Sequence, residues 1–260
     1  MTEATAATVA TAVTGSAAGG ARRVLVVGGG GGLGTAVVEQ LLAAHRFGIV
    51  GVWTVGPLQA AMRRLAAVPE ADWDRWATDT ALIVFDRARH ANGRDDAFGR
   101  PDPAALPTLA ARLRAAGATT LVVVVPHAPG LLPQALKAGI ASLDEGAVAG
   151  LGFARLVFMR AAQGGGDDGV VRAVPARLAR WLLSQLRWMV AQRDQPVRTA
   201  TVARVAARLA AALPQAAPGT RVMPPELLWA AAQRPGDDSV VDAWLQGQPL
   251  PAAVGPRQRW

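Results

Sequence analysis

Short apolar runs rich in valine alternate along this chain with longer segments whose apolar residues recur at helical spacing. Apolar runs of about four to eight residues predict buried strands, and their alternation with helices predicts βαβ units in a parallel sheet. The predicted fold class is therefore α/β, a doubly wound parallel sheet. The expected strands are Arg23–Val27, Ile49–Thr54, Ala81–Phe85, Thr119–Val125, Ala154–Met159 and a short one at Val222.

The segments between these strands carry the helical periodicity. Two stretches rich in Gly and Asp, Asp86–Pro101 and Gln163–Gly169, predict loops. The chain beyond the second loop is mostly helical, so we expect a helical C-terminal part from about residue 164. The predicted helices are Leu33–His45, a helix near Pro57–Ala67, Pro103–Ala116, Leu132–Ala149, Ala176–Gln192, Thr201–Leu213 and Pro224–Gln233.

The domain organisation follows from length and composition. A chain of 260 residues with 51% hydrophobic content can bury one large core, and the continuous series of strands favours a single domain over residues 22–233. Residues 1–21 are rich in Ala, Thr and Gly and predict a disordered tail. Residues 234–260 carry many Pro, Gly and Gln and predict a loosely ordered tail.

The composition excludes several kinds of chemistry. The chain has no cysteine, which excludes disulfides, thiolate catalysis and cysteine metal sites and leads us to expect a cytoplasmic location. No apolar run reaches the roughly 18 residues of a membrane span. His45, His90 and His127 are too scattered to predict a metal site. The net charge is +8, but the arginines are scattered, which favours a compositional bias over a nucleic-acid surface.

A glycine run, Gly28–Gly32, followed by Leu33 and Gly34, joins the first strand to the first helix. Strand, glycine turn and helix form the context of a dinucleotide-binding turn, because glycines let the backbone approach a diphosphate and the N–H groups of the helix N-terminus face its oxygens. The run fits G-x-x-G-x-x-G and also G-x-G-x-x-G. A turn that only lets the helix pack on the sheet is the alternative. The predicted cofactor is NAD or NADP, bound by Gly28, Gly31, Gly32, Leu33 and Gly34.

The end of the second strand supplies no charge to read the ribose of a dinucleotide. An acid at this place usually binds the ribose hydroxyl of NAD, and an arginine nearby accepts the extra phosphate of NADP. The strand ends Val52-Trp53-Thr54-Val55-Gly56-Pro57. Arg63 and Arg64 follow in the next predicted helix, where they either reach back to the site or form a solvated pair. We therefore expect a weak preference between NAD and NADP.

Four segments, in order along the chain, resemble the atypical, NmrA-like branch of the short-chain dehydrogenase/reductase superfamily. Val24–Gly34 is similar to its first glycine turn, and Ala118–Ala128 is placed like its strand ending in Ser-Ser-x-Gly. Ala147–Arg160 resembles its "LGFERLTIFRP" strand, and Pro196–Ala206 is similar to its late V-x-x-V-A-x-A helix start. The resemblance covers roughly residues 22 to 232 and implies a Rossmann-like, NAD(P)-binding fold.

The resemblance also implies catalytic groups that this chain lacks in large part. Those reductases use a Tyr-x-x-x-Lys pair and a serine to move a proton while the nicotinamide moves a hydride. This chain has no tyrosine, and the matching serine region, Val124–Ala128, holds no serine. Lys137 stands four residues after Pro133, and Ala141 fits the family spacing better. His127, at the end of the central strand, is the best substitute acid or base, and a hydrogen-bonded loop histidine is the alternative.

Three functions follow from these patterns. The leading one is a dinucleotide-binding protein, non-catalytic or catalytically altered, that senses NAD(P) or binds a protein partner. The second is an active NAD(P)-dependent oxidoreductase or epimerase that uses His127 or the cofactor alone. The third is an interaction protein that has lost the nucleotide. The apolar stripe of Ala176–Gln192, which includes Trp181, is expected to pack inside the domain or against a second copy.

Overall fold

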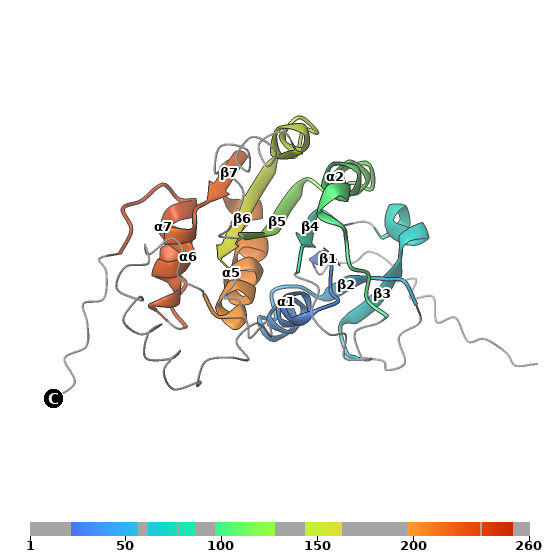
Figure 1. Cartoon of the computed structure of the whole chain (residues 1–260), viewed down its shortest axis with the longest axis horizontal. Helices are drawn as coiled ribbons and strands as arrows, with labels where there is room; N and C mark the ends of the chain where they lie inside the picture. The colour runs from blue at the N-terminus through green and yellow to red at the C-terminus, as the bar shows by residue number, and fades with distance from the viewer. Residues whose placement is uncertain are drawn as a thin grey trace, which may run out of the picture.

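Every apolar run predicted as a strand forms one in the computed structural model of the protein (Figure 1). The structure describes residues 22–56, 62–76, 78–86, 97–127, 144–162, 197–234 and 236–251. Within these residues the strands form one sheet in the order β3-β2-β1-β4-β5-β6-β7, and all neighbours are parallel. The strands are β1 (Arg23–Val27), β2 (Ile49–Thr54), β3 (Leu65–Pro69), β4 (Thr80–Val84), β5 (Thr120–His127), β6 (Arg155–Ala162) and β7 (Gly219–Met223).

The strand order makes the sheet doubly wound. From β1 the chain builds outward to β2 and β3, then returns to place β4 on the other side of β1 and continues to β7. The direction of winding therefore reverses between β1 and β4, and open α/β sheets bind their ligands outside the carboxyl ends of the strands at such a reversal. The predicted fold class, a Rossmann-like α/β sheet with a helical C-terminal part, is confirmed.

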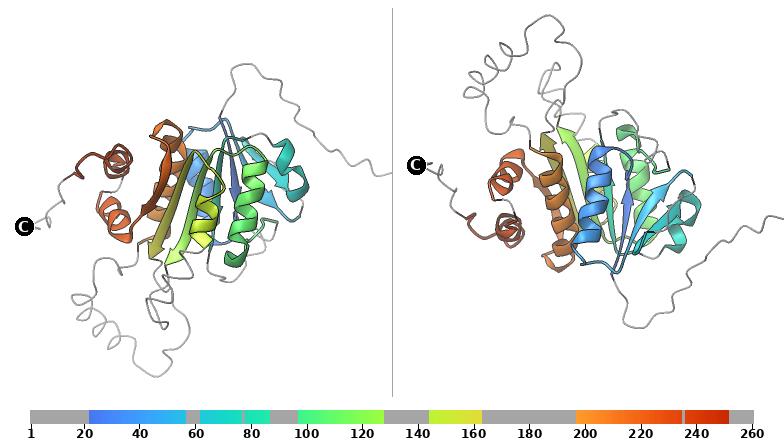
Figure 2. Two further views of the ribbon diagram at one scale, coloured as in Figure 1. Left: turned by 90° about the horizontal axis from the view of Figure 1, so that it is seen from above. Right: turned by 90° about the horizontal axis from the view of Figure 1, so that it is seen from below.

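Helices cover both faces of this sheet (Figure 2). On one face α1 and α5 lie side by side, and α6 and α7 pack against α5. On the other face lie α2 and a helical segment over residues 144–149. The α-helices are α1 (Gly32–Ala43), α2 (Leu106–Ala115), α5 (Thr199–Ala212), α6 (Pro225–Ala232) and α7 (Ser239–Leu245), and the short 3₁₀ helices are η1 (Glu70–Arg75), η2 (Pro103–Ala105) and η4 (Leu213–Gln215).

The two helical layers explain why the central strands carry apolar residues at successive positions. Successive side chains of a strand point to opposite faces of the sheet. Val24 and Val26 of β1 therefore pack in the core beneath α1 and α5, whereas Leu25 and Val27 pack in the core beneath α2. All four are fully buried. A sheet with one solvated face would instead have alternated apolar and polar residues.

The prediction of a helix near Pro57–Ala67 was wrong where the structure describes it. Leu65–Pro69 form β3, which pairs in parallel with β2 from Val50↔Leu65 to Thr54↔Pro69. The alanines in this segment favour a helix in isolation, but β2 would otherwise expose its backbone groups as an edge. Pairing with the edge of the sheet therefore outweighs local propensity here.

The prediction of loose order beyond residue 234 was wrong for Ser239–Leu245. These residues form α7, whose Val240 and Val241 are each 1% exposed. Asp238 is the N-cap residue of this helix. The helix buries its apolar face in the core that α5 and α6 share, and this packing holds a helix too short to be stable alone.

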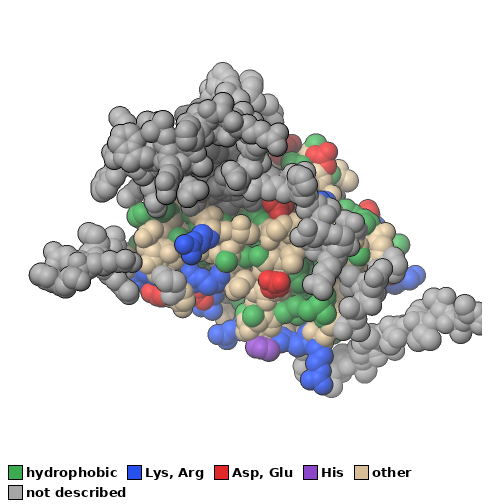
Figure 3. Space-filling model, turned by 60° about the horizontal axis from the view of Figure 1, so that its bottom comes forward, with side chains coloured by type: hydrophobic (Ala, Val, Ile, Leu, Met, Phe, Trp, Pro, Cys, Tyr) green, Lys and Arg blue, Asp and Glu red, His purple; other side chains and the backbone are tan. Residues whose placement is uncertain are grey.

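Several predicted features lie outside the described residues. They are the tail 1–21, most of Leu132–Ala149 with Lys137, and the helix Ala176–Gln192 with Trp181. Among the described residues, none of the helices combines the length and apolar character needed to cross a bilayer. The face drawn in Figure 3 carries basic side chains at several separate places, with acidic side chains among them, so charge is not gathered into one basic surface there.

Candidate functional site

The glycine turn joins β1 to α1 at the carboxyl edge of the sheet, beside β4. Gly28 and Gly31 have φ values of +101° and +97°, a region that side chains disfavour. A Cβ on Gly28 would lie 2.0 Å from the carbonyl oxygen of Val84 in β4, and one on Gly34 would lie 2.0 Å from the Gly28 oxygen. The strained and the most crowded glycines are thus Gly28, Gly31 and Gly34, which is the spacing G-x-x-G-x-x-G.

The N-terminus of α1 faces out of this turn. Gly31 is the N-cap residue and brings no side chain to accept a hydrogen bond. A Cβ on Gly32 would meet no atom within 4 Å, so the space over the first helical residue is open. The side chain of Leu33 is buried, but its N–H points out of the helix and donates to a carboxylate oxygen, Asp86 Oδ2, at 2.7 Å.

Asp86 is a site residue that the sequence reasoning missed. It lies two residues beyond the end of β4, and β4 is the strand that neighbours β1. The winding of the sheet reverses between these strands, so the first polar residue after β4 lies beside the glycine turn. Its Oδ2 would be 2.7 Å from a Cβ on Gly31, so glycine at that position makes room for the carboxylate. The signal in the sequence was the position of Asp86 after a strand, which its loop-like surroundings obscured.

A second stretch of the same connection covers the end of β2. Val55 N–H donates to Ala97 O at 2.9 Å, and Gly99 N–H donates to Trp53 O at 3.0 Å, so the chain here runs antiparallel to β2. Phe98 lies between them and reaches the turn, where its Cγ is 3.6 Å from the position of a Cβ on Gly29. The ribose of a bound dinucleotide lies at the end of this strand in Rossmann folds, so these residues stand at that place.

Arg100 is a second residue that the sequence reasoning missed. Its side chain lies against the glycine turn, with Cγ and Nε each 3.0 Å from the position of a Cβ on Gly30. The residue is exposed, and no hydrogen bond or ion pair joins it to another described residue. A positive charge therefore stands beside the turn, although the end of β2 itself carries none.

Arg64, one of the two arginines expected either to reach the site or to be solvated, does neither. Val50 N–H donates to Arg64 O at the amino end of β2, on the opposite edge of the sheet from the turn. The Arg64 guanidinium donates to Leu42 O at 3.3 Å and to Gly48 O at 3.4 Å, and it also contacts Phe47 O and His45 Nδ1. It thus holds the connection between α1 and β2 together and contributes nothing to the site.

The carboxyl ends of β5 and β6 carry the other candidate residues. His127 is the last residue of β5, in register with Ala162, and its backbone therefore lies on the same edge as the turn. Two residues earlier, Val125 pairs with Arg160 of β6. The Arg160 guanidinium donates to both carboxylate oxygens of Glu145, at 3.0 and 2.8 Å.

The partner of Arg160, Glu145, lies in the helical segment 144–149. Its side chain is only 15% exposed, and Arg160, on the neighbouring strand β6, is its counter-ion. This pair therefore stabilises the packing of the 144–149 segment on β6. In the part of the chain that is described, no three His, Asp or Glu side chains come together as metal ligands do.

Comparison with known proteins gives likenesses to solved structures alone, since no protein-family model and no curated protein sequence matches the chain. A nucleoside-diphosphate-sugar epimerase from Staphylococcus aureus is 11% identical, with a TM-score of 0.46 over 77% of this chain and 70% of that one. UDP-glucose 4-epimerase from Brucella ovis, solved with NAD, is 17% identical, with a TM-score of 0.45 over 90% of this chain and 95% of that one.

A short-chain dehydrogenase/reductase superfamily protein from Agrobacterium tumefaciens, solved with bound NAD, is 16% identical, with a TM-score of 0.44 over 78% of this chain and 77% of that one. The fold assignment rests on the chain's own strand order.

Proposed function

We propose that this protein binds a nicotinamide dinucleotide, with the diphosphate over Gly31–Gly34. The observation that carries the proposal is the position of the glycine turn at the winding reversal between β1 and β4. This is the place where open α/β sheets bind nucleotides. The open space at Gly32 and the N-terminus of α1 supply room and a positive partial charge for the phosphates.

Calorimetry of the purified protein with NAD, NADH, NADP and NADPH tests the proposal. Gly32→Asp puts a negative charge at the first residue of α1, where it suits the helix but repels a phosphate. Gly32→Asn, the neutral control, has the same shape. We expect stoichiometric binding by the wild type and by Gly32→Asn, and affinity at least tenfold lower, about 1.4 kcal/mol, for Gly32→Asp. Equal affinity of both variants would put the nucleotide elsewhere, and the absence of binding by all three proteins would refute the proposal.

The neighbouring arginine bears on the choice of cofactor. Arg100 stands beside Gly30, and its segment is paired with the end of β2, so it is the residue that supplies a charge for the extra phosphate of NADP. The weak preference expected from the sequence therefore becomes a preference for NADP. Arg100→Gln should lower the affinity for NADP several-fold more than the affinity for NAD, and an equal loss for both would assign Arg100 to the diphosphate they share.

The protein is further proposed not to carry out the tyrosine-dependent reduction of the family it resembles. The absence of any tyrosine supports this, because general acid assistance contributes about 10²–10⁴ in rate. We expect no carbonyl-dependent oxidation of NADH or NADPH across a panel of aldehydes, ketones and quinones. Turnover that is lost in His127→Ala would establish an active oxidoreductase instead. Turnover that survives this change would indicate a reaction that needs the cofactor alone.

One observation favours a second candidate, an interaction protein that has lost the nucleotide. Asp86 and Phe98–Arg100 already contact the turn that a dinucleotide would use. The calorimetric result separates the two candidates, since this one predicts no binding of any nucleotide by any variant. The cytoplasmic location, and a partner or second copy bound through Ala176–Gln192, stay predictions.

A further inference from the structure

The carboxylate of Asp86 holds the position of an anion at the N-terminus of α1. A helix leaves its first N–H groups without backbone partners, and here the N-cap Gly31 has no side chain to bind them. Leu33 N–H is instead bound by Asp86, which lies 53 residues away in the sequence, at 2.7 Å. This distance lies at the short end for an N–H···O bond, as is usual when the acceptor is charged.

The turn is shaped closely around this carboxylate. A Cβ on Gly31 would lie 2.7 Å from Oδ2 and 3.3 Å from the carboxyl carbon of Asp86. One carboxylate oxygen therefore touches both the Cα side of Gly31 and the N–H of Leu33. A phosphate oxygen that binds the same N–H would need the same space and carries the same sign of charge, so the two anions exclude each other.

Phe98–Pro101, in the described part of the connection between β4 and α2, lie over the neighbouring part of the turn. Phe98 lies over Gly29, Arg100 lies over Gly30, and Pro101 Cδ is 3.1 Å from the position of a Cβ on Gly28. Main-chain hydrogen bonds from this stretch to Trp53 and Val55 tie it to β2. The same connection therefore meets the turn from both of its ends, at Asp86 and at Phe98–Pro101.

We propose that Asp86 is an internal competitor for the diphosphate of the dinucleotide. The nucleotide binds only when the carboxylate leaves Leu33 N–H, so Asp86 lowers the affinity of the protein for NAD(P). When no nucleotide is bound, the carboxylate occupies this N–H. This inference rests on the proposed function, because it takes the ligand of the turn to be a dinucleotide. It also explains how a turn with the glycine spacing of a nucleotide site is filled by the chain itself.

Two variants and a matched control test the proposal by calorimetry with NAD, NADP and inorganic pyrophosphate. Asp86→Ala removes the carboxylate, and Asp86→Asn keeps its shape without its charge. Asp102→Ala is the control. The Asp102 carboxylate likewise accepts a hydrogen bond from one backbone N–H at a helix start, that of Ala104 at 3.0 Å. This helix is η2 and not α1, so the bond lies outside the glycine turn. Thermal unfolding without ligand shows whether each variant is folded, and lower midpoints are expected for Asp86→Ala and Asp102→Ala alike.

We expect the affinity of Asp86→Ala for NAD or NADP to be at least tenfold higher than that of the wild type, with Asp86→Asn between them and Asp102→Ala unchanged. If Asp86→Ala also binds inorganic pyrophosphate more tightly than the wild type does, the carboxylate competes with the diphosphate part of the nucleotide. A dinucleotide that binds the wild type and Asp86→Ala equally overturns the inference and leaves the proposed function in place. The failure of all variants to bind any nucleotide overturns both. If Asp86→Ala is unfolded, Asp86→Asn decides the question, since loss of the charge alone must raise the affinity.

Discussion

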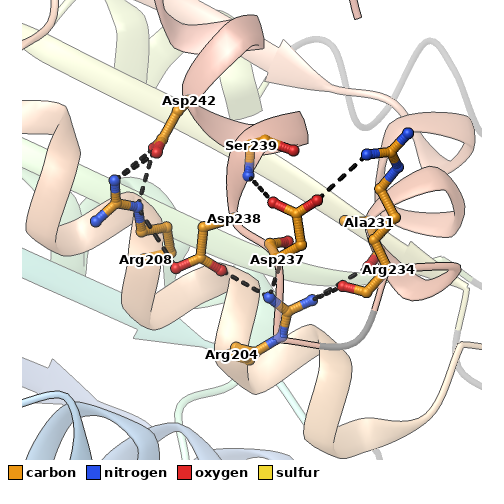
Figure 4. Close-up of polar contacts among 8 residues, drawn as sticks. All are labelled: Arg204, Arg208, Ala231, Arg234, Asp237, Asp238, Ser239 and Asp242. Carbon is orange, nitrogen blue, oxygen red and sulfur yellow. Dashed lines mark hydrogen bonds and ion pairs between the residues drawn. The ribbon is translucent and has the colours of Figure 1, made fainter. Parts of the chain in front are cut away.

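The glycine turn and the C-terminal helices use charged side chains in opposite ways. In the C-terminal layer, arginines of α5 pair with aspartates next to and within α7 (Figure 4). Arg204 donates to Asp238 at 2.6 Å, and Arg208 donates to both oxygens of Asp242 at 2.7 and 2.6 Å. At the glycine turn, Asp86 binds a backbone N–H, and Arg100 has no ionic partner among the described residues.

This difference separates charges that hold the fold from charges that a ligand can replace. Arg204 and Arg208 each have a counter-ion from another element, and removal of either partner leaves a half-buried charge. Asp86 and Arg100, at the glycine turn, form no ion pair of this kind with a described residue. The diphosphate of a dinucleotide has the charge to replace the carboxylate, and the extra phosphate of NADP has the charge to bind the arginine. The predictions below test whether the two regions differ in this way.

The largest effect on stability is expected from Gly34→Ala, which tests how closely the backbone packs within the glycine turn. The new Cβ would lie 2.0 Å from the backbone oxygen of Gly28, which has no freedom to move away. We expect a loss of at least about 4 kcal/mol in the free energy of unfolding, or no folded protein. Urea unfolding measures the loss. Gly32→Ala is the control, because nothing lies within 4 Å of its Cβ, and it should change stability by less than about 1 kcal/mol.

A smaller effect is expected from Arg208→Ala in the C-terminal layer. The Arg208 and Asp242 side chains are 25% and 32% exposed, so solvent screens their attraction in part, and we expect a loss of about 1 kcal/mol. The same measurement on Arg75→Ala should show almost none, because Arg75 is 85% exposed and pairs with Asp72 at 3.5 Å. The coupling energy from a double-mutant cycle of Arg208 and Asp242 isolates the pair. A coupling of zero would remove the contrast between the regions.

The smallest effect is expected from Asp237→Asn, as a dependence on pH. Ser239, whose side chain lies beside the carboxylate and whose N–H donates to it at 2.8 Å, lowers the pKa of Asp237 below its ordinary value of 3.8, and Arg234 lowers it further. A lowered pKa stabilises the fold above the ordinary value, and this contribution is lost as the pH falls through the lower value.

The thermal midpoint of Asp237→Asn should therefore lie below that of the wild type at pH 7. The difference should shrink below about pH 4, where the wild-type carboxyl takes up its proton. Asp74→Asn changes an exposed carboxylate with no bond to a described residue and should match the wild type throughout. A difference for Asp237→Asn that is constant with pH would show that the carboxylate charge has no part in holding α7.

The sequence predicts most of the sheet because its signals are local. The run Val24–Val27, the glycines after it and the periodicity of α1 each lie within a few residues, so strand, turn and helix follow directly. The pairing of β3 is not local. Leu65–Pro69 becomes a strand only because β2 offers an edge, and no pattern within those residues contains that edge. The helix α7 is missed for the same reason, since its stability comes from burial against α5 and α6.

The candidate site divides in the same way. The spacing of Gly28, Gly31 and Gly34 is one of two that the sequence allows, and positive φ and close backbone contact in the structure favour it. Asp86 and Arg100 are not found, since a polar residue in a loop carries no sign of what it will face. The strand order was the missing information. Because β4 lies beside β1, Asp86, the first polar residue after β4, lies beside the glycine turn.

A crystal structure of the protein with bound NADP or NAD tests the central claim most directly. The account predicts a diphosphate oxygen at about 2.7–3.2 Å from Leu33 N, with the Asp86 carboxylate moved away from that N–H. In the complex with NADP it also predicts the Arg100 guanidinium on the extra phosphate. A nucleotide bound at another place while Asp86 still accepts from Leu33 N–H would contradict the account.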